Sequence, residues 1–266
     1  MIPARRRWGQ NFLVHPETAR RIVLAAELSP EESVIEVGPG DGALTGLLLE
    51  AARRVLAIEI DPARAAALAR RLGNTAEDRL RVRQGDALRK RYAEHLAEEG
   101  WEPPAVLVAN LPYNVATPLL TQAVEEPGAI SRIVATVQRE VADRLTARAG
   151  DAAYGFLSIR TAAFARVRRL FDIPPGAFRP TPKVVSSVVA LRPDAAPPSP
   201  HRARALSLAS RAFHARRKVL PNALAGEGTR ETWVRALSEI GKDARARAEE
   251  LSYEDWLALA AIAGRA

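Results

Sequence analysis

The stretch VIEVGPGDGALT, residues 34–45, decides the fold class of this chain. It continues an apolar, strand-like run, Ser33–Val37, and it leads into Gly42–Arg53, where leucines recur with the spacing of one helix face. Glycines between a strand and a helix let the backbone turn sharply and let a ligand approach without a Cβ in the way. The three glycines of this turn are Gly38, Gly40 and Gly42. The stretch therefore predicts a strand–turn–helix unit of an α/β fold, although a plain tight turn would also explain the glycines.

The same alternation continues through the next hundred residues. Apolar runs typical of buried strands are separated by segments with helical spacing. The expected strands are Arg54–Ile58, Leu80–Gln84, Ala105–Ala109 and Arg132–Val137, and the expected helices include Pro62–Leu72 and Gln138–Arg148. This order predicts an open, largely parallel, doubly wound sheet. Val167–Ile173 and Val184–Leu191, joined by the turn PPGAFRPTPK, are expected to add an antiparallel pair at the sheet edge.

A proline-rich stretch, Arg192–Pro200, is typical of a linker. Residues 1–192 are therefore expected to form one domain, with a basic N-terminal arm, and residues 193–200 to form the linker. Residues 201–266 lack strand alternation and predict three or four helices, the last of them capped by Ser252.

Composition narrows the functional classes. The 266 residues are 47% hydrophobic, contain no cysteine, and hold four His without ligand spacing, so neither disulfides nor a metal site are expected. The sequence contains no run of about 18 apolar residues, so no membrane span is predicted. The N-terminus lacks the apolar core of a secretory signal, and we expect a cytoplasmic monomer with no membrane partner.

The net charge of +8 is unevenly distributed. Residues 1–160 hold 21 basic and 21 acidic residues, whereas residues 161–266 hold 18 basic and 10 acidic ones. Such an imbalance indicates a polyanionic partner, with nucleic acid as the leading candidate. Solubility and an arginine preference, since 35 of the 39 basic residues are Arg, would also explain it.

Acidic residues follow the first three strands of the predicted sheet. Glu36 and Asp41 place negative charge at the glycine loop, which suits a cationic ligand better than a phosphate. Glu59 ends the second strand, where an acid can accept both hydroxyls of a ribose. Asp86 ends the third and can accept from an adenine amine. Each alone is equally compatible with a solvated carboxylate, but together they predict a site for S-adenosylmethionine, a nucleoside with a positive centre.

The fourth strand leads into NLPYN, residues 110–114. Pro112 biases Leu111 towards an extended backbone and has no N–H of its own. The Leu111 carbonyl and the side chain of Asn110 are therefore expected to accept both hydrogens of a planar base amine, and Tyr113 to stack on its ring. A strand-ending turn is the alternative for this motif alone, and Asn114 is expected to cap a helix at Val115–Val124.

Two such acceptors would address the poor nucleophilicity of adenine N6. Its lone pair is delocalised into the ring, and hydrogen bonds to both hydrogens favour a pyramidal nitrogen with a localised pair. That pair can attack the sulfonium methyl in line. The product ammonium loses its proton to water, so no dedicated base is required.

Several motifs in this order resemble the bacterial 16S ribosomal RNA adenine N6,N6-dimethyltransferases of the kasugamycin-sensitivity type. The resemblance extends over almost the whole chain. Its motifs include RRRWGQNFL (5–13), AIEID (57–61), QGDAL (84–88), NLPYNVATPLL (110–120), VQREVADRL (137–145), AYGFLSI (153–159), FRPTPKVVSSVV (178–189) and RAEELSYEDW (247–256), together with the glycine loop. Family glycine loops often have an apolar residue at the position of Asp41.

The resemblance implies a Rossmann-like class I methyltransferase domain with a small all-helical C-terminal domain. It implies dimethylation of two adjacent adenosines in a hairpin near the 3′ end of 16S rRNA, by four methyl transfers from S-adenosylmethionine within a small-subunit assembly particle. It also implies that Phe178 forms the second wall of a base clamp, opposite Tyr113, although Phe178 by itself is typical of a core residue. The implied cofactor contacts are Asn11, Leu13, Gly38, Gly40, Glu59, Asp86 and Asn110.

Clusters of basic residues predict the RNA contacts, because they attract phosphates without reading sequence. A solvated face would explain each cluster alone. Because the excess positive charge lies in residues 161–266, we expect rRNA docking to occur mainly on the helical domain. A further cluster, Arg166, Arg168 and Arg169, lies at the start of the expected strand Val167–Ile173. The expected RNA-binding residues are Arg5, Arg6, Arg7, Lys183, Arg211, Arg216, Arg217 and Lys218.

Two other functions remain open at this point. The erythromycin-resistance type of enzyme, which dimethylates one adenosine in 23S rRNA, shares part of these motifs, but NLPYN and RAEELS favour the small-subunit type. A mainly non-catalytic factor that checks ribosome assembly is the second alternative. A DNA adenine methyltransferase is less favoured, because no second large sequence-reading insert is present.

Overall fold

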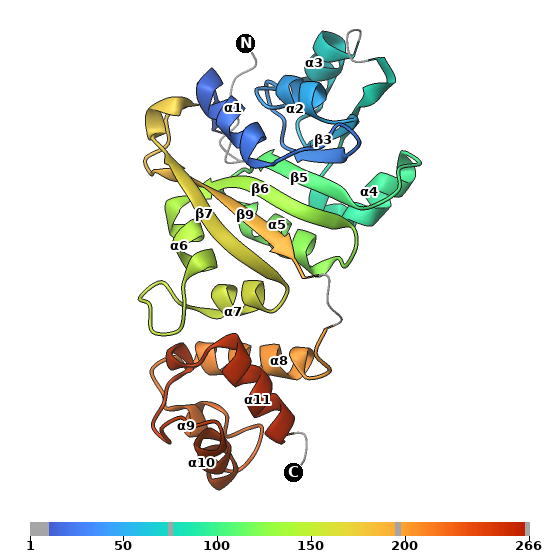
Figure 1. The fold of residues 1–266 in the computed structure, drawn as a ribbon. Coiled ribbons are helices and arrows are strands. Elements are labelled where there is room, and N and C mark those ends of the chain that lie inside the picture. The colour runs from blue at the N-terminus through green and yellow to red at the C-terminus, as the bar shows by residue number, and fades with distance from the viewer. Residues whose placement is uncertain (1–10, 74–76, 195–197, 264–266) are drawn as a thin grey trace. The chain divides into compact units, whose positions relative to one another are not determined.

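The computed structural model describes residues 11–73, 77–194 and 198–263, and the chain divides into two compact units (Figure 1). The first unit comprises residues 1–142 and 165–195, and the second comprises residues 143–164 and 196–266. The expected division at 193–200 therefore needs a correction, because residues 143–164 belong with the helical unit. Tyr154 and Ile159 explain this placement, since both are buried in the hydrophobic core of the second unit.

A seven-stranded sheet in the order β4-β3-β2-β5-β6-β9-β7 forms the centre of the first unit. The five strands from β4 to β6 are parallel, and β9 and β7 run antiparallel to them. The strands are β2 (Ser33–Val37), β3 (Arg54–Glu59), β4 (Leu80–Gln84), β5 (Ala105–Asn110), β6 (Ile130–Gln138), β7 (Ala165–Ile173) and β9 (Ser186–Pro193). The doubly wound sheet and its antiparallel edge are thus confirmed.

Helices cover both faces of this sheet, with α1, α2 and α3 on one side and α4, α5 and α6 on the other (Figure 1). Helix α2 is shorter than the expected Gly42–Arg53, because Gly42 has φ +75° and still belongs to the turn. The helices are α1 (Pro16–Ala25), α2 (Thr45–Ala51), α3 (Pro62–Leu72), α4 (Tyr92–Glu98), α5 (Ala116–Glu125) and α6 (Arg139–Thr146), with short 3₁₀ turns η2 (Glu77–Arg79), η3 (Ala87–Arg89) and η4 (Pro175–Ala177).

A separate two-stranded sheet was not expected from the sequence. Its strands, β1 (Phe12–Leu13) and β8 (Phe178–Arg179), pair Phe12 with Arg179 and Leu13 with Phe178. The Val14 N–H also donates to the Ala177 carbonyl at 2.9 Å. A strand of two residues is too short to show an alternation of apolar and polar side chains, so only the long-range pairing identifies these strands.

The second unit is helical, as expected. Its core packs around two fully buried tryptophans, Trp233 and Trp256, and Ser252 caps α11 by accepting from the Asp255 N–H at 3.2 Å. None of the helices in the described residues combines the length and apolarity needed to cross a membrane. The elements are α7 (Phe156–Ala162), α8 (Arg202–His214), α9 (Leu220–Ala223), α10 (Arg230–Glu239), η5 (Ala248–Glu250) and α11 (Tyr253–Ala263).

The two tryptophans provide a matched test of this core. The Trp233 Nε1–H donates to the Leu224 carbonyl at 3.1 Å, whereas the buried Trp256 Nε1–H has no partner among the described residues. Removing a made hydrogen bond costs stability, but removing an unpaired buried donor relieves a desolvation cost. We expect Trp233→Phe to lower the free energy of unfolding by about 1–2 kcal/mol more than Trp256→Phe. Urea unfolding of both variants measures the difference, and equal losses would contradict it.

Candidate functional site

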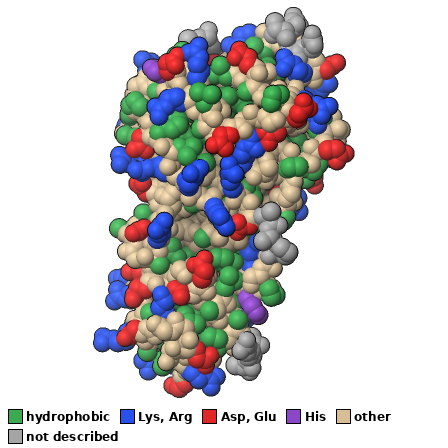
Figure 2. All heavy atoms as spheres, viewed as in Figure 1, with side chains coloured by type: hydrophobic (Ala, Val, Ile, Leu, Met, Phe, Trp, Pro, Cys, Tyr) green, Lys and Arg blue, Asp and Glu red, His purple; other side chains and the backbone are tan. Residues whose placement is uncertain are grey.

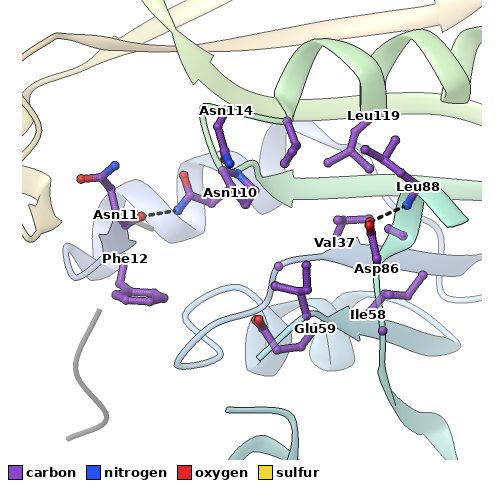
Figure 3. A pocket seen from close by; sticks show the side chains of 16 residues that line it. Asn11, Phe12, Val37, Ile58, Glu59, Asp86, Leu88, Asn110, Asn114 and Leu119 are labelled. Carbon is purple, nitrogen blue, oxygen red and sulfur yellow. Dashed lines mark hydrogen bonds between the residues drawn. The ribbon is translucent and has the colours of Figure 1, made fainter. Parts of the chain in front are cut away.

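A cavity of about 810 Å³ opens at the carboxyl ends of β2, β3, β4 and β5 (Figure 3). This is the edge of an open α/β sheet where ligands bind. Apolar side chains make most of its wall, and three polar ones, Glu59, Asp86 and Asn110, lie at strand ends. The lining residues are Asn11, Phe12, Val37, Gly38, Ile58, Glu59, Ile60, Gly85, Asp86, Ala87, Leu88, Asn110, Pro112, Asn114, Val115 and Leu119.

Glu59 is buried at the end of β3, and both of its carboxylate oxygens accept backbone hydrogen bonds. The Gly40 N–H donates to Oε2 at 3.0 Å, and the Asp61 N–H donates to Oε1 at 2.9 Å. Burial raises the pKa of the carboxyl, and these two hydrogen bonds oppose that shift. Since each oxygen has two lone pairs, Glu59 can still accept from ligand hydroxyls within the cavity.

Asp86 and Gly38 border the same cavity. The Asp86 Oδ1 accepts from the Leu88 N–H at 3.0 Å and caps the 3₁₀ turn η3 (Figure 3). The other carboxylate oxygen, Oδ2, has no hydrogen bond with a described residue and is available to a ligand donor. Gly38 has φ +69°, a conformation that glycine adopts without strain.

A buried arginine supports one wall of the cavity, and sequence reasoning missed it. Arg64 on α3 has a fully buried side chain, and its guanidinium lies 3.8 Å from the Phe12 ring centroid while pairing with Asp41. A Cβ added to Gly40 would come within 2.6 Å of the same ring. Gly40 therefore contacts Phe12 and Glu59 rather than lining the cavity. An arginine in an alanine-rich helix has no local signal that distinguishes it from a solvated one.

The expected negative charge at the glycine loop needs a correction. Glu36 is buried, accepts a hydrogen bond from the Thr45 hydroxyl at 2.7 Å, and does not line the cavity. Burial raises the pKa of its carboxyl to about 8, so Glu36 is mostly neutral at pH 7. Asp41 is paired with Arg64 and also lies outside the lining. The acids that face the cavity are Glu59 and Asp86 alone among the described residues.

Asn110 stands at the end of β5 with its carboxamide oriented by a distant segment. Its Nδ2–H donates to the Asn11 backbone carbonyl at 2.9 Å (Figure 3). With the amide nitrogen engaged, the oxygen Oδ1 is the atom presented to a ligand as an acceptor. The sequence places both residues in its predicted site, and the structure brings them into contact across 99 positions of the chain.

The rest of the NLPYN motif is divided between cavity and core. Leu111 is buried, and its N–H donates to the Thr136 carbonyl at 3.3 Å. Pro112 and Asn114 line the cavity, so the expected capping role of Asn114 is wrong: α5 begins at Ala116 without a side-chain cap. Tyr113 is half-buried outside the lining. Its hydroxyl shares a 2.6 Å hydrogen bond with Ser186, and burial raises the pKa of the phenol.

Phe178 takes the position typical of a core residue and not that of an exposed clamp wall. Its side chain is fully buried in the core of the first unit, in register with Leu13 on β1. The surrounding prolines favour an exposed loop, but pairing between β1 and β8 turns the ring inward. Neither Phe178 nor Leu13 lines the cavity, so the contacts expected of them with a base and a cofactor stay predictions.

The expected RNA-binding residues lie on both units. Lys183 is exposed in the first unit, and Arg211, on α8 of the second, pairs with Glu227 at 2.8 Å. Residues 216–218 follow α8 in a turn rather than forming part of the helix, because α8 ends at His214. Arg216 pairs with Glu249 at 2.6 Å, while Arg217 and Lys218 are exposed. The remaining expected residues, Arg5, Arg6 and Arg7, lie outside the described residues.

The basic excess is likewise shared between the two units. Residues 165–195 hold six basic and two acidic residues, and they belong to the first unit. They contribute half of the net charge of +8. RNA docking mainly on the helical domain therefore does not account for the basic residues of segment 165–195 in the first unit.

The family model and the similar sequences indicate the same family. A family model described as ribosomal RNA adenine dimethylase matches residues 1–264. Proteins named ribosomal RNA small subunit methyltransferase A are similar to this chain throughout. That of Methylococcus capsulatus is 41% identical over 96% of each chain, and that of Thermosynechococcus vestitus is 40% identical over 98% of this chain and 97% of its own.

Two solved structures share the fold over nearly the whole chain. The 23S rRNA methyltransferase ErmE is 27% identical and superposes with a TM-score of 0.74 over 96% of this chain and all of its own. A dimethyladenosine transferase from Plasmodium falciparum, 24% identical, has a TM-score of 0.76 over 93% of this chain and 95% of its own. The second likeness supports the Rossmann-like fold alone.

The neutral Glu36 leads to a prediction about stability and pH. Its carboxyl pKa is about 8 in the folded protein against an ordinary value of 4.5, so the unfolded chain releases this proton first. The contribution of Glu36 to stability is therefore complete below pH 4.5 and is lost as pH rises towards 8. We expect the wild type to lose about 1.4 kcal/mol per pH unit across this window relative to Glu36→Gln. Urea unfolding of both proteins at several pH values tests this prediction. If the free energies of unfolding of the wild type and the variant change with pH in parallel, the carboxyl is not buried and neutral.

Proposed function

The chain belongs to the ribosomal RNA adenine dimethylase family, and on this premise we propose its substrate and reaction. We propose that it dimethylates the N6 amines of two adjacent adenosines in a hairpin near the 3′ end of 16S rRNA, using S-adenosylmethionine. The proposed partner is a small-subunit assembly particle in the cytoplasm, on which the protein acts as a monomer. Relatives at about 40% identity that are named small subunit methyltransferase A favour this substrate over 23S rRNA.

The orientation of Asn110 is the observation that carries this proposal. The Asn11 carbonyl engages Nδ2, which leaves Oδ1 beside the cavity as a hydrogen-bond acceptor. An acceptor at this position matches an amine substrate.

The cavity fits the methyl donor by its chemistry. Glu59 offers acceptors for ribose hydroxyls, Asp86 offers a free oxygen for the adenine amine, and Val37, Ile58 and Leu88 supply apolar contacts for the ring. When bound, S-adenosylmethionine supplies an electrophilic methyl group. The positive φ of Gly38 lets the backbone approach such a ligand closely.

The chain's own residues then activate the nucleophile. Asn110 Oδ1 and the Leu111 carbonyl accept the two N6 hydrogens of the target adenosine. The nitrogen lone pair becomes localised, and it would be the nucleophile for the methyl group that S-adenosylmethionine would supply. The resulting ammonium loses its proton to water. For the second transfer only one N–H remains, so the same two acceptors hold the monomethylated amine with one hydrogen bond.

A flipped adenosine needs a stacking surface, because extrusion from the RNA costs a few kcal/mol. Tyr113 is proposed to provide it, at about 1–3 kcal/mol per stacked base. The hydrogen bond to Ser186, on β9, anchors its hydroxyl and thereby limits rotation of the ring. Phe178 is buried in this conformation, so the proposed clamp rests on Tyr113 alone.

Asn110→Ala tests the catalytic proposal and separates it from a purely checkpoint function. We expect the variant to lower the methyl-transfer rate by about 100- to 1,000-fold, the loss typical of removing one pre-organised hydrogen-bonding group. Binding to small-subunit particles should be retained. Mass spectrometry of dimethyladenosine in 16S and 23S rRNA measures the product and also identifies the substrate. Asn222→Ala, an exposed asparagine in the helical unit, is the control. A normal rate for Asn110→Ala would refute the assigned role.

The turn after α8 gives a second prediction. Arg217 and Lys218 are exposed, whereas Arg216 is already paired with Glu249. If this turn contacts phosphates, Arg217→Glu/Lys218→Glu should weaken particle binding. It should also reduce the slope of log K against log[salt] by about 1.5, near 0.7–0.9 per lost phosphate contact. Binding measured over a salt series checks this, and an unchanged slope would exclude the turn from the interface.

A further inference from the structure

A second hollow, of about 600 Å³, lies on the first unit far from the reaction cavity. Its floor is formed by apolar residues of the antiparallel edge, Leu170, Phe171 and Ala190. Arginine side chains border it, among them Arg168 and Arg192. Figure 2 shows Lys and Arg side chains on the face that β7 and β9 present. None of these residues has a place in the proposed reaction.

The charges around this hollow are not balanced within the protein. Arg166 lies directly opposite Arg192 on the neighbouring strand, and like charges in this position are destabilising. Arg168 lies two residues further along β7 and shares the face of Arg166. Arg192 has a partner in Glu27 at 3.1 Å. Arg166 and Arg168 are exposed and make no ion pair or hydrogen bond with any residue in the described ranges.

A third arginine, Arg21 on α1, contacts a residue that lines this hollow. The Arg21 guanidinium lies 4.0 Å from the centroid of the Phe171 ring, and it too makes no ion pair within the described part of the chain. The contact with the ring holds the guanidinium near the hollow while its N–H groups remain available. Arginine N–H groups in this arrangement match the oxygens of a phosphate.

We propose that Arg21, Arg166 and Arg168 form a docking surface for the phosphate backbone of the rRNA substrate, here called the β7 arginine face. The inference rests on the proposed function. Arg166 is displaced from Asn110 by three strand spacings and four residues along the strands, or about 20 Å. The contact is therefore with an RNA segment other than the target adenosines, and it positions the substrate without reading its sequence.

Charged residues also protect edge strands against pairing with other chains, and this is the competing explanation for β7. Edge protection needs charge of either sign, whereas phosphate docking needs positive charge. Reversal of the sign therefore separates the two explanations. An acidic ribosomal protein as the occupant would be distinguished by using protein-free rRNA.

The experiment compares three variants of the full chain, with methyl transfer measured on small-subunit particles and binding over a salt series measured with protein-free 16S rRNA. In Arg166→Glu/Arg168→Glu, we expect KM for the RNA to rise about tenfold or more and the salt slope to fall by about 1.5, the loss of two phosphate contacts. The affinity for S-adenosylmethionine, measured without RNA, should not change. Arg166→Lys/Arg168→Lys should retain most of the RNA affinity. Arg53→Glu/Arg70→Glu, on exposed sites of the same unit, makes the same change in net charge and should have a smaller effect.

Three results would overturn the β7 arginine face. They are an unchanged KM and salt slope in the Glu variant, an equal loss in the control variant, and a loss confined to intact particles while protein-free rRNA is unaffected. Failure of the proposed function looks different, because the wild type would then not methylate rRNA at all. Thermal unfolding of each variant confirms that the sheet edge is intact.

Discussion

The buried carboxylate of Glu59 is the constraint on which the reaction cavity depends. One oxygen binds the glycine loop after β2 through Gly40, and the other binds the turn after β3 through Asp61. Hydrogen bonds to an acceptor in such a low-dielectric position are strong, and leaving the acceptor unpaired would be costly. The two loops that border the cavity are therefore tied to one side chain, which also presents the acceptor proposed for the cofactor ribose.

From this point the organisation of the site extends to the catalytic end of β5. The tied loop places Gly40 against the ring of Phe12, and Arg64 also packs on that ring. With Phe12 held in place, the neighbouring carbonyl of Asn11 is positioned to engage the amide of Asn110. The short strand β1 thus links the cofactor side of the cavity to the proposed acceptor for the adenosine amine. A change in Arg64 would be transmitted to Asn110 through β1.

The two basic surfaces proposed for RNA have a common property, since arginine–phosphate contacts carry no sequence information. Selection of a particular adenosine must then come from geometry: the target has to reach the cavity while other RNA segments occupy the docking surfaces. A structured ribosomal particle can meet several such constraints at once. The proposed docking contacts account for a basic excess that the two units share.

The sequence alone determined the hydrophobic period of each element and the order in which strands and helices follow one another along the chain. Alternation and glycine turns are local properties of the chain. Parallel strands then bring Glu59, Asp86 and Asn110 to one edge of the sheet, so these positions were predictable. Tertiary structure alone decided which side chains are buried by distant segments. Pairing with β1 buries Phe178, and the sheet interior makes Glu36 neutral. Burial depends on contacts across the whole chain, and no local pattern of residues records them.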